Sequence, residues 1–332
     1  MNDALTILQK KLCNLLQDGL PICRRPYAEL AKSLNSDEKT VLRSVRQLRD
    51  MQIIRRTGAL INYRVLGRVS TLVAAHIAQE NLREVVEAVN SLAGVSHNYL
   101  RDHHYNLWFT LQADSQREIK VLLARLSKRF RTEFYSLSAR RAFKLDVRFD
   151  AGRNGPDFIG VKNSSPDLSG LKDKAIKLTN DEKYIISKLQ CNLKCVAQPF
   201  DFLCNENLKI DDVLKIIKRL IDKGVIRRIA AIVNHRRLGF VANVLFAAKV
   251  KDEQIERVGK KLASLAMVSH CYHRKTFECW PYNLLAMMHN RNVRQLRQAV
   301  TNFTKTESIA SFELLPTIAE LKRQPVRQMP VP

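Results

Sequence analysis

The first fifty residues carry apolar side chains at helical spacing. Leu8, Leu12 and Leu15 recur every three or four positions, which is the period of one face of an α-helix. A second helix is expected over residues 27–34. Asn35-Ser36-Asp37 then offers an N-cap and an acidic first turn to a third helix that runs to about Asp50. The apolar segment 53–63 is expected to form a two-stranded wing that turns at Gly58, so this part of the chain predicts a winged helix-turn-helix.

Beyond the wing, short apolar segments alternate with longer helical ones. The expected strands are residues 70–77, 95–101, 105–113 and 134–147, and the expected helices are residues 82–92 and 115–128. The resulting order β-α-β-β-α-β is that of the ferredoxin-like fold.

The chain repeats this series once. The segment IIRRTGALINYRVLG at 53–67 matches VIRRIAAIVNHRRLG at 225–239, and Val-Ser-His at 95–97 matches Val-Ser-His at 268–270. Tyr-Asn-Leu at 105–107 likewise matches Tyr-Asn-Leu at 282–284. In the second copy the expected strands are 241–250, 268–273, 282–289 and 308–315, and the expected helices are 252–265 and 293–304. The fold class is therefore α+β, a tandem repeat of a winged helix-turn-helix plus a ferredoxin-like module.

The repeat divides the chain into six parts. The first copy comprises a winged helix-turn-helix at 1–67 and a ferredoxin-like domain at 68–150. A linker rich in Gly, Pro and Ser is expected at 151–177. The second copy comprises a winged helix-turn-helix at 178–239 and a ferredoxin-like domain at 240–324, and a flexible, Pro-rich tail is expected at 325–332.

Composition narrows the class of partner. The 332 residues include 56 Lys and Arg against 32 Asp and Glu, a formal charge of +24, which favours an anionic partner such as nucleic acid, a membrane surface or a polycarboxylate. No run of 18 apolar residues and no secretory signal is seen, so we expect no membrane association and a cytoplasmic protein. The seven cysteines are then expected to be reduced thiols.

The architecture resembles that of the Lrp/AsnC transcription regulators, but the helices that would read DNA begin with acidic residues. The first opens with Asp37 and Glu38, and the second carries Asp211 and Asp212. Carboxylates at these tips would be repelled by phosphates, whereas basic residues further along the helices could still meet them. DNA binding is therefore disfavoured, and an inherited packing role for the helix-turn-helix is the alternative.

Unusual chemistry is concentrated in one hairpin of each ferredoxin-like half. The stretches 95–111 and 268–289 hold six of the eight histidines and both tryptophans. On a strand, every second side chain shares a face, so each copy presents a row of His, Tyr and Arg. The two rows are His97, Tyr99, Arg101 and His270, Tyr272, Arg274. Such a row suits a flat, aromatic, anionic ligand, since Arg pairs with carboxylates and the aromatic rings offer stacking surface. A solvated polar face is the plainer alternative.

Other chemistries have weaker signals. Cys271 and Cys279 flank a turn near His270 and His273, so a zinc site is possible, but the spacing is irregular. No cysteine has a clear base beside it for nucleophilic catalysis, and no Gly-rich phosphate loop is seen.

At these hairpins the sequence resembles the siroheme decarboxylase family. RDHHYNLWFTL at 101–111 is similar to one subunit type and SHCYHRKTFECWPYNLLAMMH at 269–289 to the other, and both copies carry the IRR-x5-N-x3-LG wing. A fusion of the two types looks like the version used in heme d1 synthesis, whereas separate subunits are typical of the alternative heme pathway. Two positions depart from the family pattern, His104 where an acidic residue is expected and Asn290 where glycine is expected.

The resemblance implies a non-oxidative decarboxylation. The family removes the acetate carboxyls at C12 and C18 of siroheme, giving 12,18-didecarboxysiroheme and two CO2, with no cofactor besides the iron that belongs to the substrate. It also implies association with homologous subunits or a homo-oligomer. A transcription regulator, or a sensor that binds the tetrapyrrole without chemistry, stays as an alternative.

The resemblance also implies roles for the residues of the hairpins. Arg274 and Arg101 would clamp carboxylates, and His270 and His97 would donate protons or ligate the substrate iron, while the protein itself holds no metal. The second copy is favoured as the catalytic one. Further substrate contacts are expected from Tyr272, Trp280, Tyr282, Asn283, His289, His103, His104, Tyr105 and Asn106. Arg55, Arg56, Arg227 and Arg228 are expected mainly on the surface of the wings, with carboxylate binding as the lesser alternative.

Overall fold

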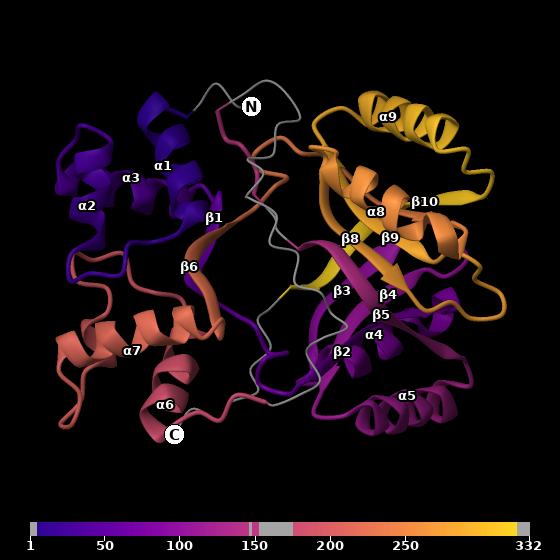
Figure 1. Cartoon of the computed structure of the whole chain (residues 1–332), viewed down its shortest axis with the longest axis horizontal. Coiled ribbons are helices and arrows are strands. Elements are labelled where there is room, and N and C mark those ends of the chain that lie inside the picture. The colour runs from indigo at the N-terminus through magenta and orange to yellow at the C-terminus, as the bar shows by residue number, and fades with distance from the viewer. Residues whose placement is uncertain (1–4, 146–147, 153–174, 324–332) are drawn as a thin grey trace.

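The computed structural model describes residues 5–145, 148–152 and 175–323. These residues form two modules that lie side by side (Figure 1), a helical module and a β-barrel. Each module is built from both copies of the repeat. The linker expected at 151–177 lies for most of its length outside the described residues, and the tail at 325–332 lies entirely outside them.

The helical module contains the N-terminal part of each copy. Its first-copy elements are α1 (Ile7–Asp18), α2 (Pro26–Ser33), α3 (Glu38–Asp50) and β1 (Ile54–Ile61). Its second-copy elements are α6 (Asn180–Leu189), the 3-10 turn η3 (Asp201–Leu203), α7 (Ile210–Asp222) and β6 (Ile226–Val233). Local sequence sets the helix starts, because Thr6 and Thr179 each form a capping box with the Gln or Glu three residues later, and Asp37 caps α3.

The prediction of a two-stranded wing within residues 53–63 is wrong, because this segment forms only one strand. Residues Ile54–Ile61 form a single strand, which pairs antiparallel with β6 of the other copy, and Gly58 lies opposite Ala230 in the middle of that ribbon. Gly58 has no positive φ of the kind that tight hairpin turns require. It is needed instead for space, since a Cβ here would come within 2.9 Å of the Cys191 carbonyl oxygen. Pairing between copies joins two apolar strands into one ribbon, which a hairpin within a copy would not do.

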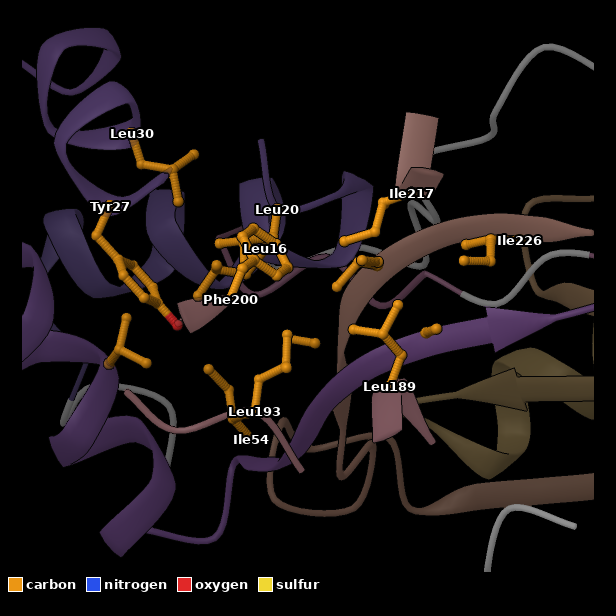
Figure 2. Close-up of a cluster of buried hydrophobic side chains, with 14 of the residues drawn as sticks. Leu16, Leu20, Tyr27, Leu30, Ile54, Leu189, Leu193, Phe200, Ile217 and Ile226 are labelled. Carbon is orange, nitrogen blue, oxygen red and sulfur yellow. The ribbon is translucent and has the colours of Figure 1, made fainter. Parts of the chain in front are cut away.

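One hydrophobic core is shared by both copies in the helical module. Figure 2 shows Leu16 and Tyr27 of the first copy close to Leu189, Phe200 and Ile217 of the second. All five side chains are fully buried. The two helix-turn-helix units therefore fold as a pair, as the subunits of a dimer do, although they belong to one chain.

The barrel is closed by eight antiparallel strands in the order β10-β3-β4-β2-β5-β8-β9-β7. The first-copy strands are β2 (Val69–Ala75), β3 (Val95–Arg101), β4 (Leu107–Ala113) and β5 (Phe134–Leu145), and the second-copy strands are β7 (Ala242–Ala248), β8 (Val268–Arg274), β9 (Leu284–Asn290) and β10 (Phe312–Arg323). Its outer face is covered by α4 (Leu82–Ser91), α5 (Gln116–Phe130), α8 (Ile255–Ser264) and α9 (Val293–Thr306), with the 3-10 turns η2 (Gln79–Asn81) and η4 (Asp252–Gln254).

Two long strands close the barrel. The first part of β5 pairs with β2 of its own copy, and the second part pairs with β8 of the other copy. In the same way β10 pairs first with β7 and then with β3. The strand predicted at 308–315 is β10, which starts at Phe312 and ends eight residues later than expected. The extension forms because its second part pairs with a strand of the other copy. Closure leaves no free sheet edge in the barrel.

Candidate functional site

The His-Tyr-Arg rows of both copies face the barrel interior. Along β3, Val95 packs beneath the helices and Asn98 bonds to Asn90 of α4. A register irregularity between Val95 and His97 shifts the alternation, so the residues of the row, from His97 to Arg101, point inward. The Arg101 guanidinium donates to the Leu315 carbonyl oxygen at 3.1 Å. Along β8, Arg274 donates to the Leu137 carbonyl oxygen at 2.8 Å, and its guanidinium lies 4.3 Å from the centre of the Tyr272 ring.

A pocket of about 240 Å³ opens where the helical module meets the barrel. Arg227 of β6, the last residue of β1 and the segment 62–64 that follows it form one side. The barrel forms the other side with residues of β2, β3, β4, β5 and β8. Its polar lining consists of Asn62, Tyr63, Arg64, Arg68, Ser70, Thr71, Ser96, His97, Thr110, Gln112, Arg227, Tyr272 and Arg274. The pocket is thus composite, with His97 from the first copy and Tyr272 and Arg274 from the second.

The pocket is strongly cationic. Four arginines line it, Arg64, Arg68, Arg227 and Arg274, and no carboxylate does. Arg68 pairs with Asp114 at 2.6 Å, whereas Arg64 and Arg227 form no ion pair with a described residue. Burial lowers the pKa of Arg274 to about 10, which leaves it charged at neutral pH. Guanidinium groups without carboxylate partners are suited to bind an anionic ligand with several carboxylates.

His97 is a neutral group in this cationic pocket. Its Nδ1 lies 2.8 Å from Ser96 Oγ, which is also 2.8 Å from Thr110 Oγ1, and Nε2 has no hydrogen-bond partner among the described residues. Burial, together with the charge of Arg323, lowers the pKa of His97 to about 3. A neutral imidazole can ligate iron, and when Ser96 donates its hydroxyl hydrogen to Nδ1, Nε2 carries a proton.

We expect the buried histidines to make stability depend on pH. Burial lowers the pKa of His97 and of His235 to about 3 and that of His289 well below its usual value. The unfolded chain binds protons at these groups below about pH 6.5 while the folded chain does not, so stability is complete above that pH and is lost as the pH falls towards 3. Each such imidazole contributes up to about 1.4 kcal/mol per pH unit. Urea unfolding at pH 7.5, 6 and 5 measures the slope.

His235→Gln is the matched control for this dependence. It removes one buried imidazole. The slope of the unfolding free energy against pH should therefore decrease by the amount that corresponds to about one bound proton. An unfolding free energy that is the same at pH 7.5 and pH 5 would contradict the expectation.

The other predicted contacts lie away from the pocket. His103, His104, Tyr105, Trp280 and Tyr282 lie at or next to the turns of the two hairpins, where their rings pack against one another. The Trp280 and Trp108 rings are 5.2 Å apart in the barrel interior, and Trp280 is 1% exposed. None of the five lines the pocket. The rings of Tyr105, Trp108 and Trp280 fill the interior, which explains much of the aromatic content of the hairpins by packing.

The repeated asparagines have a structural role in each copy. Asn106 accepts from the backbone N–H of Ile77 at 2.9 Å and donates to its carbonyl at 2.8 Å. Asn283 forms the same pair of bonds with Val250. These side chains therefore hold the strand ends together, and the pattern Tyr-Asn-Leu marks a fold constraint that the sequence alone does not separate from a binding role.

His270 and His289 lie on the second side of the barrel opening. Ser269 Oγ is 3.1 Å from His270 Nδ1 and 3.0 Å from His289 Nε2. Neither histidine lines the pocket, nor does Arg101. The pocket therefore combines residues of both copies, and of the two predicted catalytic pairs it holds His97 and Arg274.

Arg64, Arg68 and Arg227 line the pocket but were not among the expected substrate contacts. Arg64 and Arg68 had no assigned role, and Arg227 was expected mainly on the wing surface. A signal lay in the differences between the repeats, since Arg68 aligns with Phe240 in the second copy. The structure adds that Ala142 and Glu320 occupy corresponding positions in the two copies. Ala142 pairs with Tyr272 on β8, and Glu320 pairs with Tyr99 on β3. Glu320 neutralises Arg55 at 2.5 Å, and Ala142 leaves the equivalent Arg227 without such a partner.

The alternative chemistries find little support in the geometry. Cys271 is fully buried on the helix-facing side, whereas Cys279 is exposed, and no group of three potential metal ligands occurs in the part of the chain that is described. The acidic residues at the helix tips form ion pairs within the chain, since Glu38 pairs with Arg25 and Asp211 pairs with Arg24 at 2.7 Å.

None of the described helices is both long and apolar enough to cross a membrane.

Comparisons with known proteins agree with the two modules. The family described as AsnC-like ligand binding domain matches residues 65–144 and 237–322, and the family described as siroheme decarboxylase NirDL-like HTH domain matches residues 9–55. A siroheme decarboxylase of Hydrogenobacter thermophilus is 31% identical over 94% of this chain and 92% of its own length. The siroheme decarboxylase alpha subunit of Desulfovibrio desulfuricans is 42% identical over 43% of this chain and 82% of its own length.

Solved structures show the same arrangement. The crystal structure of the siroheme decarboxylase NirDL has a TM-score of 0.70 and 28% identity, covering 96% of this chain and 94% of that one. A second structure of NirDL, in co-complex with an iron-uroporphyrin III analogue, has a TM-score of 0.69 with 28% identity, covering 96% and 93%. The similarity therefore extends over both copies and both modules.

Proposed function

This chain belongs to the siroheme decarboxylase family, and from that premise we propose that it acts as a carboxy-lyase on siroheme in the composite pocket. The observation that carries the location is the set of four arginines, without a lining carboxylate, beside the neutral His97. Siroheme is a polycarboxylate, so its carboxylates would be bound by these guanidinium groups. The proposed product is 12,18-didecarboxysiroheme.

The proposed reaction needs two contributions from the protein. The bond between the acetate methylene and its carboxyl carbon breaks, CO2 leaves, and the electron pair remains on the methylene next to the macrocycle. The macrocycle delocalises that pair, and a proton converts the methylene to a methyl group. The arginines would orient the acetate, and His97 Nε2 would donate the proton or bind the iron of the substrate. The sequence of steps uses no oxidant and no resident cofactor.

The pocket would receive one edge of the macrocycle. Its volume of about 240 Å³ is below the roughly 300–1,000 Å³ of pockets that enclose a drug-sized ligand. An acetate side chain and the adjoining pyrrole fit this description, with the remaining ring at the opening between the modules. The two acetates would then be presented in turn.

The fused chain contains both halves of the site. Strands β1 and β6 pair across the copies, and so do β5 with β8 and β10 with β3. The contacts that separate homologous subunits would have to form between chains are thus present within this one. We propose that the chain is active without a second homologous subunit, so the association expected from the resemblance is not required for activity.

Anaerobic incubation of the purified chain with siroheme, followed by mass spectrometry of the tetrapyrrole, tests this proposal. The expected result is the loss of two CO2 per molecule from the chain alone. Loss of one CO2 would contradict the proposal that both acetates react without a partner. Unchanged siroheme that stays bound would support the alternative of a tetrapyrrole sensor.

A further inference from the structure

The barrel opening has a second side, where the same types of residue occupy positions equivalent to those in the pocket. Ser269 and His270 repeat the pair Ser96 and His97, and Arg101 on β3 occupies the position that Arg274 occupies on β8. The strand registers that relate β3 to β10 and β8 to β5 are also the same. The fold therefore builds the walls of two sites, and the pocket described above is one of them.

The second side is filled by a side chain of the protein itself. Phe149, which follows β5 and is 2% exposed, packs its ring against two imidazoles that also contact each other. The ring centre lies 5.3 Å from that of His235, with nearly parallel planes, and 5.1 Å from that of His289, edge to face. Phe240, which aligns with Arg68 of the open pocket, lies 5.1 Å away. The Phe149 ring thus occupies a niche beside Phe240 and two histidines, which are themselves bonded to Asn243 and Ser269.

The Phe149 segment is anchored to α1 in the helical module. Gln17 donates to the Phe149 carbonyl at 2.9 Å and accepts from its backbone N–H at 2.8 Å. Asn14 accepts from Ala151 N–H and donates to the Asp150 carboxylate. These side chains belong to another module than the barrel, so they keep the ring in place without contributing to the niche.

Two buried polar atoms around the niche have no hydrogen-bond partner among the described residues. His235 is 3% exposed and its Nδ1 is unpaired, although Asn243 occupies its Nε2 at 3.2 Å. Arg101 is 4% exposed and its Nε is unpaired. Unpaired buried polar atoms destabilise a protein, and they are explained when a site was built to hold a polar ligand.

We infer that this niche is a second site for an aromatic polycarboxylate of the substrate's class, and that Phe149 occupies it so that the chain binds one such ligand. The inference rests on the proposed function for the class of ligand. Binding to the second site would be weaker than binding to the open pocket, because Glu320 neutralises Arg55 beside it, where the open pocket has Ala142 beside Arg227.

The test counts binding sites for iron-uroporphyrin III by equilibrium dialysis. The wild-type chain is expected to bind one equivalent of ligand, and the Phe149→Ala variant is expected to bind two. The matched control Phe149→Leu keeps an apolar side chain in the niche and should bind one. The gained equivalent should persist when Arg274→Ala is added to Phe149→Ala. A folded Phe149→Ala variant that binds no more than the wild type would overturn the inference, and so would a gain that Arg274→Ala abolishes.

A second variant covers the possibility that Phe149→Ala does not fold. Gln17→Ala removes only the two hydrogen bonds that hold the Phe149 backbone, and should reveal the second equivalent at higher ligand concentration. No gain in Gln17→Ala would then overturn the inference. The wild-type count tests the proposed function separately, because the second site is measured by the difference between variant and wild type.

Discussion

Arg274→Ala is expected to lower kcat/KM for siroheme about 100-fold while the protein stays folded. Arg274 is held by the Leu137 carbonyl and by the face of Tyr272, and it lines the pocket. Hydrogen bonds to charged groups contribute roughly 1.5–3 kcal/mol each, and a guanidinium can make two of them to one carboxylate. Removing the group leaves the carboxylate of the substrate unpaired in the pocket. Steady-state kinetics under anaerobic conditions, with near-UV circular dichroism to check folding, measures the effect.

Two further variants show whether the loss of activity in Arg274→Ala comes from its charge, its geometry or its position. Arg274→Lys keeps the charge without the bidentate geometry, so its kcat/KM should lie between those of wild type and Arg274→Ala. Arg101→Ala removes the equivalent guanidinium, which is buried and bonded to Leu315 and Thr317. Its main expected effect is a lower melting temperature. A folded Arg101→Ala protein that loses as much activity as Arg274→Ala would place the reaction on the second side of the barrel.

Ala142→Glu is expected to lower kcat/KM by at least 30-fold by neutralising Arg227 of the pocket. Ala142 pairs with Tyr272, as Glu320 pairs with Tyr99, so a glutamate here should bind Arg227 as Glu320 binds Arg55. The change removes one cation from the pocket and adds a carboxylate that repels the substrate. Losing one charge-assisted contact of roughly 1.5–3 kcal/mol corresponds to about a 10- to 150-fold change.

Ala142→Gln is the matched control, since it adds the same bulk without charge. It should lose several-fold less activity than Ala142→Glu. Arg227→Ala should also lower kcat/KM in the wild-type background, but should have little further effect when Ala142→Glu is present, because the same cation is already neutralised. Equal losses in Ala142→Gln and Ala142→Glu would show that bulk and not charge is responsible.

The order of elements in each copy could be predicted from sequence, because it depends on local patterns. Helix starts follow from capping residues such as Thr179 and Asp37, and the core strand β3 was expected at its observed bounds. The repeat showed that the series occurs twice. The alternation along β3 and β8 also placed His97 with Arg101, and His270 with Arg274, on one face, since successive side chains of a strand point to opposite sides.

Contacts between the copies could not be predicted in this way. β1 was expected to form a hairpin within its own copy, yet it pairs with β6, and the second part of β10 pairs with β3. Sequence periodicity shows that a segment is a strand and which face is apolar, but not which strand it pairs with. The partner is decided by the area buried in the assembled barrel and ribbon.

The sequence by itself thus indicated an anionic ligand, through charge, and the residues that share one face of each hairpin, through alternation. The tertiary structure alone decided which side of the barrel is open. Ala142 leaves Arg227 available, whereas Glu320 neutralises Arg55 and Phe149 fills the niche beside His235. These residues are distant along the chain and come together only when strands of different copies pair, so their combined charge and volume are properties of the fold.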